Sequence, residues 1–247
     1  MKKVILVLVM ATLSVSLLQA DILIKTNTHT AAFEMMGQSS PAKDEETMFW
    51  IAKSKFATIT PELHMMADLE KKVAYFIYPK SKTYVETQLP LDMSQLLPEQ
   101  MVQMMSAIKI AAEVKPSGET KKIGEWDCKG YDVLLSVTGM MPMKMNIKAW
   151  ASTDVPFDWE TYTNEMLPVF MKAATANMPF GDEIISEFQK IKGFQIASET
   201  TTNIMGVDMK VSTKVLEITK VKSAPKGTFD VPEGFTKQKK LMMERPH

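Results

Sequence analysis

The sequence is poor in the side chains that most catalytic and metal sites need. It contains a single cysteine, Cys128, and 3 histidines, which are His29, His64 and His247. One cysteine cannot close an internal disulfide, so burial and hydrogen bonds must hold the fold together. The sequence also lacks a Gly-x-Ser-x-Gly elbow, a His-Glu-x-x-His helix, a Walker loop and a paired-cysteine metal motif. We therefore expect a protein that is not an enzyme and that needs no cofactor.

An excess of charge of either sign is absent too. Lys and Arg number 29, Asp and Glu number 29, and the formal net charge at pH 7 is zero. Proteins that bind nucleic acids or anionic membrane surfaces usually carry a basic excess. The composition therefore argues against both of these partner classes.

Long apolar runs are missing except at the N-terminus, where Lys2 and Lys3 precede an apolar stretch from Val4 to Leu18. A small residue, Ala20, follows this stretch. This order is typical of a signal peptide over residues 1–20, cleaved after Ala20. The run is shorter than the ~20 residues of a membrane-spanning helix, and no nearby cysteine offers a site for a lipid anchor. We expect a periplasmic or secreted protein without a membrane span after cleavage, with an uncleaved anchor as the alternative.

Alternating apolar and polar residues are abundant, and the clearest case is residues 141–150. There Met141, Met143, Met145, Ile147 and Ala149 alternate with polar residues, which predicts a strand with one apolar face. Residues 130–137 alternate in the same way, and Thr138-Gly139 can form the turn of a hairpin. A strand with a polar face indicates an antiparallel sheet that is covered on one side only.

Other segments predict a β-rich chain with a few helices between the strands. Loop composition marks residues 37–46, and a meander of short strands follows up to residue 87. The predicted helices span residues 98–112, 158–177 with a break at Pro168, and 181–191. The predicted closing strands span residues 194–203 and 207–220, and Phe229, Val231 and Phe235 follow as docking residues in the stretch after Pro225.

Methionine is unusually frequent, with 22 residues, and it recurs on predicted inward faces. Because methionine is flexible and tolerates varied partners, these faces indicate an adaptable apolar cavity. The predicted cavity lies between the strand at 141–150 and the helix at 98–112. Its predicted lining residues are Met141, Met143, Met145, Ile147, Met101, Met104, Met105 and Ile108.

Two other interpretations of the methionines stay open. Thioethers are soft ligands, so Met141, Met143 and Met145 are an alternative Cu(I) site, although alternate strand positions lie about 7 Å apart. The methionines can also form an ordinary closed core, which would suit a structural or interaction module of the envelope without a small ligand. Cys128 has no predicted basic partner, so we expect a structural role for it.

Several segments resemble an uncharacterised exported family, catalogued as domain of unknown function 4412. The similar segments are residues 48–56, 71–84 and 118–131, together with Trp150 and the stretch Phe229-Asp230-Val231-Pro232-Glu233-Gly234-Phe235. The order of elements also resembles, more distantly, the periplasmic lipoprotein carriers of the LolA and LolB type. That resemblance implies an open, curved sheet around helices, with a cavity for acyl chains.

Together these observations predict an α+β fold. In it, a strongly curved antiparallel sheet, an open half-barrel, carries helices on its concave face. The expected organisation is a signal peptide at 1–20, a single domain at 21–236 and a flexible charged tail at 237–247. The expected function is non-catalytic binding of a hydrophobic ligand such as a lipid or a lipoprotein acyl chain, with an envelope protein as a further partner.

Overall fold

The structure, a computed structural model, describes residues 20–242 except for residues 36, 107, 140–141, 175–181 and 205. Residues 1–19 lie outside this range, so the signal peptide stays a prediction. Most of the described chain belongs to a 12-stranded sheet, in the order β14-β8-β7-β6-β5-β4-β1-β13-β12-β11-β10-β9. All neighbouring strands are antiparallel except β14 and β8, which run parallel. The prediction of a large antiparallel sheet with few helices is confirmed.

The strands of this sheet are β1 (Asp21–Thr30), β4 (Lys43–Ile51), β5 (Lys55–Ile59), β6 (His64–Asp68), β7 (Val73–Tyr78), β8 (Thr83–Gln88), β9 (Lys109–Ile123), β10 (Trp126–Thr138), β11 (Met143–Ser152), β12 (Phe194–Ile204), β13 (Val207–Val221) and β14 (Thr236–Gln238). A separate hairpin joins β2 (Phe33–Met35) to β3 (Gln38–Ser40). The helical segments are α1 (Met93–Leu96), α2 (Glu99–Ser106), α3 (Trp159–Thr161), the π-helical turn η1 (Tyr162–Met166), α4 (Leu167–Ala174) and α5 (Asp182–Phe188).

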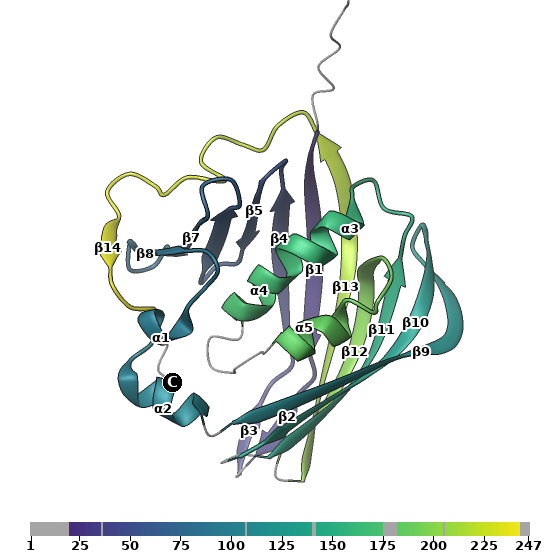
Figure 1. The fold of residues 1–247 in the computed structure, drawn as a ribbon. Coiled ribbons are helices and arrows are strands. Elements are labelled where there is room, and N and C mark those ends of the chain that lie inside the picture. Colours follow the sequence, from purple (N-terminus) through teal and green to yellow (C-terminus); the bar gives the residue numbers. More distant parts are fainter. Residues whose placement is uncertain are drawn as a thin grey trace, which may run out of the picture.

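Strand β1 joins the two halves of the sheet. On one side it pairs with β4, which begins the meander β4 to β8, and on the other side it pairs with β13. Strands β12, β11, β10 and β9 extend the sheet beyond β13 (Figure 1). The first strand of the domain is therefore held between segments that follow it by about 20 and 190 residues in the sequence.

The predicted hairpin is confirmed as a pair of antiparallel strands. Strands β10 and β11 pair so that Val133 lies opposite Ile147 and Leu135 lies opposite Met145. These side chains share one face, because residues directly opposite each other in an antiparallel pair point the same way. The two closing strands are confirmed as well, as β12 and β13.

Helical segments α3 to α5 lie over one face of the central strands (Figure 1). Asp158 begins this region as predicted, since its carboxylate accepts hydrogen bonds from the backbone N–H groups of Glu160 and Thr161 at 3.1 and 3.0 Å. Pro168 has no N–H to donate to the preceding turn. The chain forms the π-helical turn η1 just before it, where the N–H of Leu167 bonds to the carbonyl of Tyr162. The predicted irregularity thus lies one turn earlier than Pro168.

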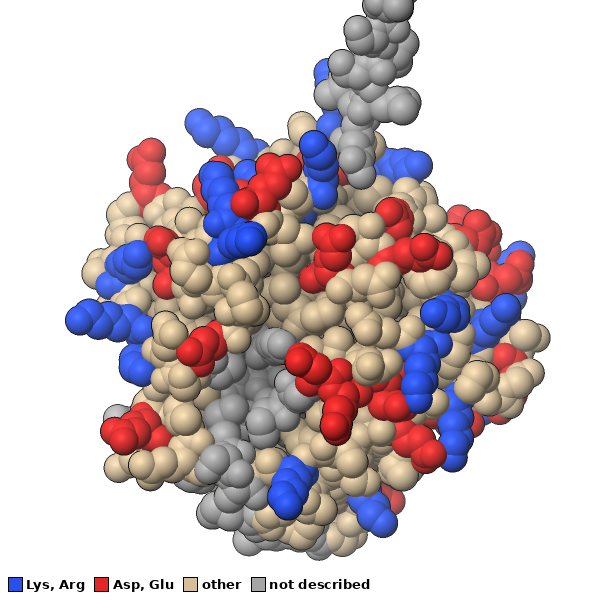
Figure 2. Space-filling model, in the orientation of Figure 1, with Lys and Arg blue, Asp and Glu red and all other residues tan. Residues whose placement is uncertain are grey.

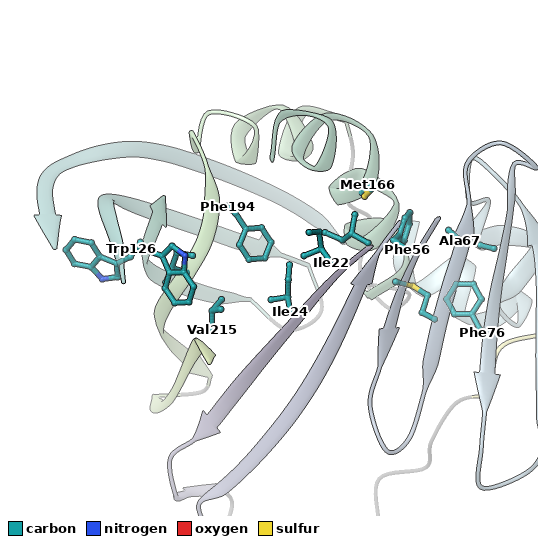
Figure 3. Packing of buried hydrophobic residues seen from close by; sticks show 14 of the residues in the cluster. Ile22, Ile24, Phe56, Ala67, Phe76, Trp126, Met166, Phe194 and Val215 are labelled. Carbon is teal, nitrogen blue, oxygen red and sulfur yellow. The ribbon is translucent and has the colours of Figure 1, made fainter. Parts of the chain in front are cut away.

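The same face carries the largest core cluster. Met166 from η1 packs with Ile22 and Ile24 from β1 and with Phe194 from β12 (Figure 3). The cluster continues along the meander to Phe76 on β7. The helices are thus attached to the sheet by apolar contacts with its central strands. Burial of apolar side chains is the strongest stabilising contribution to a fold.

The opposite face of the meander is also covered. Trp50, Ala57, Met66 and Ile77 form a second cluster there, against which Phe229, Val231 and Phe235 pack. The prediction that the stretch after Pro225 would dock is confirmed. The expectation of a sheet covered on one side only is therefore wrong for the meander. In β6, the residues from Met65 to Asp68 are all buried, whichever face they point to.

Two predicted elements differ from the structure. The helix expected over residues 98–112 ends at Ser106, and β9 begins at Lys109. Ile110, Ala112 and Val114 alternate with more exposed residues, so a period of two prevails over the helical stripe. Residues 38–40 and 43–46, expected in a loop, are strands. Their polar composition hid them, because β3 belongs to the separate hairpin and the first residues of β4 are mostly exposed.

The predicted start of the flexible tail, at residue 237, also differs from the structure. Thr236–Gln238 form β14, where the Lys237 ammonium lies 3.0 Å from the Glu86 carboxylate. The Leu241 side chain is buried, and its N–H bonds to the carbonyl of Leu96 at 2.9 Å. The ordered domain therefore extends to residue 242, and residues 243–247 lie outside the described residues.

We expect the C-terminal covering segment to stabilise the meander. Phe229→Ala should lower the free energy of unfolding by about 1–3 kcal/mol, less than a fully buried phenylalanine, because Phe229 is only half-buried. Leu216→Ala is the control, since Leu216 is 49% exposed, and it should change stability by less than about 0.5 kcal/mol. Urea midpoints measure both effects. Equal midpoints for the two variants would show that the segment contributes nothing.

Candidate functional site

A cavity of about 290 Å³ lies between the central strands and the helical cover. Strands β1, β4, β13 and β12 form its floor, and η1, α4 and α5 form its cover. The residues that line it are Thr26, Thr28, Thr47, Phe49, Tyr162, Thr163, Leu167, Met171, Phe188, Ile191, Gly193, Phe194, Gln195, Ile196, Ala197, Thr213 and Val215.

The floor changes from aliphatic to hydroxyl side chains at the same level on neighbouring strands. On β1, Ile22 and Ile24 are followed on the same face by Thr26 and Thr28. Thr26 lies opposite Thr47 on β4, and Thr28 lies opposite Thr213 on β13. We call Thr26, Thr28, Thr47 and Thr213 the threonine belt.

Hydrogen bonds within the threonine belt are few. The hydroxyls of Thr28 and Thr213 lie 3.1 Å apart, and the Thr26 hydroxyl lies 3.5 Å from the Thr47 carbonyl. The first contact is a good hydrogen bond and the second is a long one. The belt is thus a polar strip on the floor of the cavity.

Two β-bulges flank the cavity. The register between β1 and β13 shifts between Lys25 and Thr26, which leaves Leu216 as the additional residue on β13. The register between β11 and β12 shifts between Trp150 and Ala151, which leaves Ile196 additional on β12. Bulges bend a strand and increase its twist, and they are frequent beside functional sites. Here they re-aim Val215 and Ile196, both of which line the cavity.

Aromatic rings build one part of the cover. Tyr162 packs edge-on against Phe194 and Phe157, with ring centroids 5.1 and 6.2 Å away. Such edge-to-face pairs hold rings in defined orientations.

A glycine, Gly193, lies where the chain enters β12 beside the cavity. It has a φ of 108°, and a Cβ there would lie 2.4 Å from the carbonyl oxygen of Ser152. Only glycine fits this approach, so the chain can turn from α5 into β12 beside the cavity.

The cavity is electrically neutral as far as its described lining shows. None of the lining residues carries a formal charge at neutral pH. Burial raises the pKa of the Tyr162 hydroxyl, which therefore stays protonated. Since an ionised group costs free energy to bury without a partner, this lining suits an uncharged or apolar occupant.

The structure separates the two predicted halves of the methionine cavity. Met145 and Ile147 pack in a cluster with Ile184 and Phe188 of α5 and Met171 of α4. Met101 instead packs against the cluster that contains Leu96 and Leu97. The cover of the methionine strand is thus α5 and α4, and the predicted roof by the helix at 98–112 is wrong. That helix is short because β9 takes its second half.

The remaining predicted residues are placed as follows. Met143 lies on β11 opposite Val137, and Ile108 lies between α2 and β9, outside any helix. Met104 and Met105 belong to α2, but their side chains lie outside the described residues, as does the whole of Met141. Of the predicted residues whose side chains the structure describes, none is among those that line the cavity. Their binding role stays untested.

Histidine, cysteine and carboxylate side chains form no metal-binding cluster in the described part of the chain. No group of three or more His, Cys, Asp or Glu residues converges there. Cys128 is 2% exposed, and burial together with the neighbouring Asp127 raises the pKa of its thiol. The thiol thus stays protonated near neutral pH, as a structural cysteine does. Burial lowers the pKa of His64, which favours its neutral form.

A second hollow of about 580 Å³ lies at the other end of β1. Ile22, Ile51 and Met166 line it together with Lys53, Asp158 and Lys220. Its lining is therefore mixed in charge and includes Ala20, the first described residue. Because a ligand pocket is usually a mostly apolar cavity with a few polar groups, the cavity above the threonine belt fits that description better.

Sequence reasoning missed this cavity because its residues come from five distant segments. The only local signal was the change from Ile22 and Ile24 to Thr26 and Thr28 along the first strand. That change is typical of ordinary strands, since threonine is common in strands.

In the part of the chain that the structure describes, no helix is long and apolar enough to cross a membrane.

Comparison with solved structures gives distant similarities. No protein-family model matches the sequence, and no curated protein matches it either, so membership of the family of domain of unknown function 4412 stays a prediction. A structure described as an outer membrane lipoprotein-sorting protein domain, from Vibrio parahaemolyticus, is similar over 85% of this chain and 89% of its own, with 7% identity and a TM-score of 0.28. A DUF1329 family protein from Desulfovibrio piger is similar over 86% and 90%, with 5% identity and a TM-score of 0.24. At these TM-scores neither similarity assigns a function to this chain.

Proposed function

We propose that this protein is an exported, non-catalytic binding protein for a hydrophobic ligand, which occupies the cavity between the central strands and the helical cover. The cavity itself is the observation that supports this function. It lies between the sheet and the helices, its lining is mainly apolar, and no charged residue belongs to its described lining. Sites for apolar small molecules have this composition.

In this proposal the sheet acts as an open half-barrel, and its concave face holds the helices and the ligand. The helices α3 to α5 lie over the central strands, where the floor of the cavity is (Figure 1). Periplasmic lipoprotein carriers, to which the order of elements in the sequence is similar, use such an arrangement. We extend that role to this chain as an apolar-ligand carrier, with the envelope as its place of action.

The size of the cavity limits the ligand. Pockets for small molecules have volumes of about 300–1,000 Å³, so this cavity lies at the lower end of the range. It suits one chain or one ring system rather than several acyl chains together. Met171 in the cover can adjust to its shape, because the unbranched and flexible methionine side chain fills irregular gaps.

A cavity-filling substitution tests the site. Val215 is buried on the floor and lines the cavity, so Val215→Phe should place its ring in the free volume. We expect stability to change by less than about 1 kcal/mol, since the ring meets little overpacking. Binding of the uncharged fluorescent probe N-phenyl-1-naphthylamine should fall at least about tenfold, because the ring occupies the probe's volume.

The matched control is the same substitution in a filled part of the core. Val133 is buried on β10 and does not line the cavity. Val133→Phe should cost about 1–3 kcal/mol by overpacking and leave probe binding unchanged in the folded fraction. Urea midpoints and probe titrations measure both variants. Absence of probe binding by the wild-type protein would refute the proposed function, and equal destabilisation by both variants would refute an open cavity.

A triple substitution on the methionine strand distinguishes the apolar-ligand proposal from the copper hypothesis. The triple change Met141→Leu, Met143→Leu and Met145→Leu conserves volume and apolarity, so it should cost less than about 1.5 kcal/mol per site and retain probe binding. Leucine cannot replace a thioether ligand. Anaerobic Cu(I) titration of the wild-type and triple-variant proteins checks this. Stoichiometric Cu(I) binding that only the wild type shows would favour the copper interpretation.

A further inference from the structure

The threonine belt is a polar strip in an otherwise mainly apolar cavity, so a ligand with both an apolar part and a polar group fits it. We infer that the cavity selects single-chain amphiphiles with an uncharged, hydrogen-bonding head group, such as an alcohol, and that the Thr28–Thr213 hydroxyl pair binds this head group. This inference rests on the proposed function and names the ligand class of the same site. It follows from hydrogen-bond counting, from the charges around the cavity and from the position of the threonine belt.

Hydrogen-bond counting leaves a donor available on the floor. Each threonine hydroxyl carries one hydrogen and two lone pairs. The hydroxyls of Thr28 and Thr213 lie 3.1 Å apart, so one donates to the other, and this bond uses only one of the two hydrogens. The second hydrogen and the remaining lone pairs are left for a further partner. Both residues line the cavity, so an oxygen atom of a ligand can accept this hydrogen bond.

The position of the threonine belt orients the ligand. Thr26, Thr28 and Thr47 continue the inward faces on which Ile24 and Phe49 lie. One part of the floor is therefore polar, whereas the adjoining floor and the cover, with Tyr162, Phe188 and Leu167, are largely apolar. An amphiphile fits this arrangement with its head group at Thr28 and Thr213 and its chain under the helices.

The charges around the cavity disfavour an anionic head group. The described lining contains no lysine or arginine that could pair with a carboxylate. Opposite Thr28 on β4 lies Glu45, and the Lys43 ammonium is already 3.0 Å from its carboxylate. A single threonine hydroxyl does not replace the hydration of an ionised carboxylate, so burying that group there is unfavourable.

The helical cover adds negative charge on its outer surface. Figure 2 shows acidic side chains over the region of α3 to α5, and the exposed acidic residues of these elements include Glu160, Glu165 and Glu183. Like charges repel an approaching anion, although salt screens this effect beyond about 10 Å. An uncharged head group meets neither the repulsion nor the cost of desolvating a charge.

Amphiphiles with equal chains and different charges test the inference. Decanol, decanoate and decyltrimethylammonium are compared as competitors of N-phenyl-1-naphthylamine at neutral pH. We expect decanol to displace the probe at concentrations at least about tenfold lower than the two charged competitors, since neither finds a partner in the lining. Equal displacement by decanoate, or tighter binding of decyltrimethylammonium, would overturn the inference.

Isosteric variants locate the head-group site. The double change Thr28→Val and Thr213→Val removes both hydroxyls and retains the side-chain shape. It should weaken decanol binding roughly two- to tenfold, the usual effect of one lost hydrogen bond, and leave probe binding intact. The control is Thr219→Val on the same strand, because Thr219 donates to Glu217 and does not line the cavity. It should leave decanol binding unchanged.

The outcomes separate this inference from the proposed function. If the wild-type protein binds neither the probe nor any competitor, the proposed function itself fails. If the probe binds but the valine double variant binds decanol as the wild type does, the hydroxyl pair is not the head-group site and only the inference fails. If decanoate binds and loses affinity with Lys53→Gln and Lys220→Gln, the second hollow holds the head group, which also overturns the inference.

Discussion

The pairing of β1 with both β4 and β13 is the interaction on which the rest of the structure depends. It joins the N-terminal meander to strands β9 to β13, and without it the sheet would be two separate halves. With a single cysteine, no disulfide can hold this junction. Backbone hydrogen bonds and the apolar contacts of Ile22 and Ile24 hold it instead. The cavity lies directly over this junction, so the strands that unite the fold also form the floor of the site.

The helical cover explains why a cavity remains at this point. The π-helical turn η1 precedes Pro168, and bulges beside Ile196 and Val215 bend the strands below it. Irregular backbone on both sides separates cover and floor locally, whereas Met166 and Phe194 hold them together next to the cavity. The threonine belt then provides a polar strip on the floor of the cavity. A neutral, mainly apolar volume results, and it suits an uncharged chain.

Sequence patterns predicted what depends on local periodicity. The strict alternation from Met143 to Ala149 predicted the β10–β11 hairpin and its inward face, and the start of the helical region at Asp158 was predicted as well. Sequence patterns did not predict the element type where the spacing of apolar residues fits both a helix and a strand. Ile108 and Ala112 fit a helix with Met101 and also fit a strand with Ile110, and sheet pairing with β10 decided the outcome. The cavity could not be predicted, because Thr26, Thr47, Thr163 and Thr213 meet only through the register of distant strands.

The central claim is that the cavity holds one small uncharged amphiphile. Native mass spectrometry of the protein purified without detergent from an exporting host tests this most directly, since it weighs the protein with whatever it retains. We expect a single adduct with the mass of one neutral single-chain lipid, which organic extraction removes and identifies. A protein that carries no adduct, a copper ion or a lipid with several acyl chains would show that the cavity does not hold this ligand.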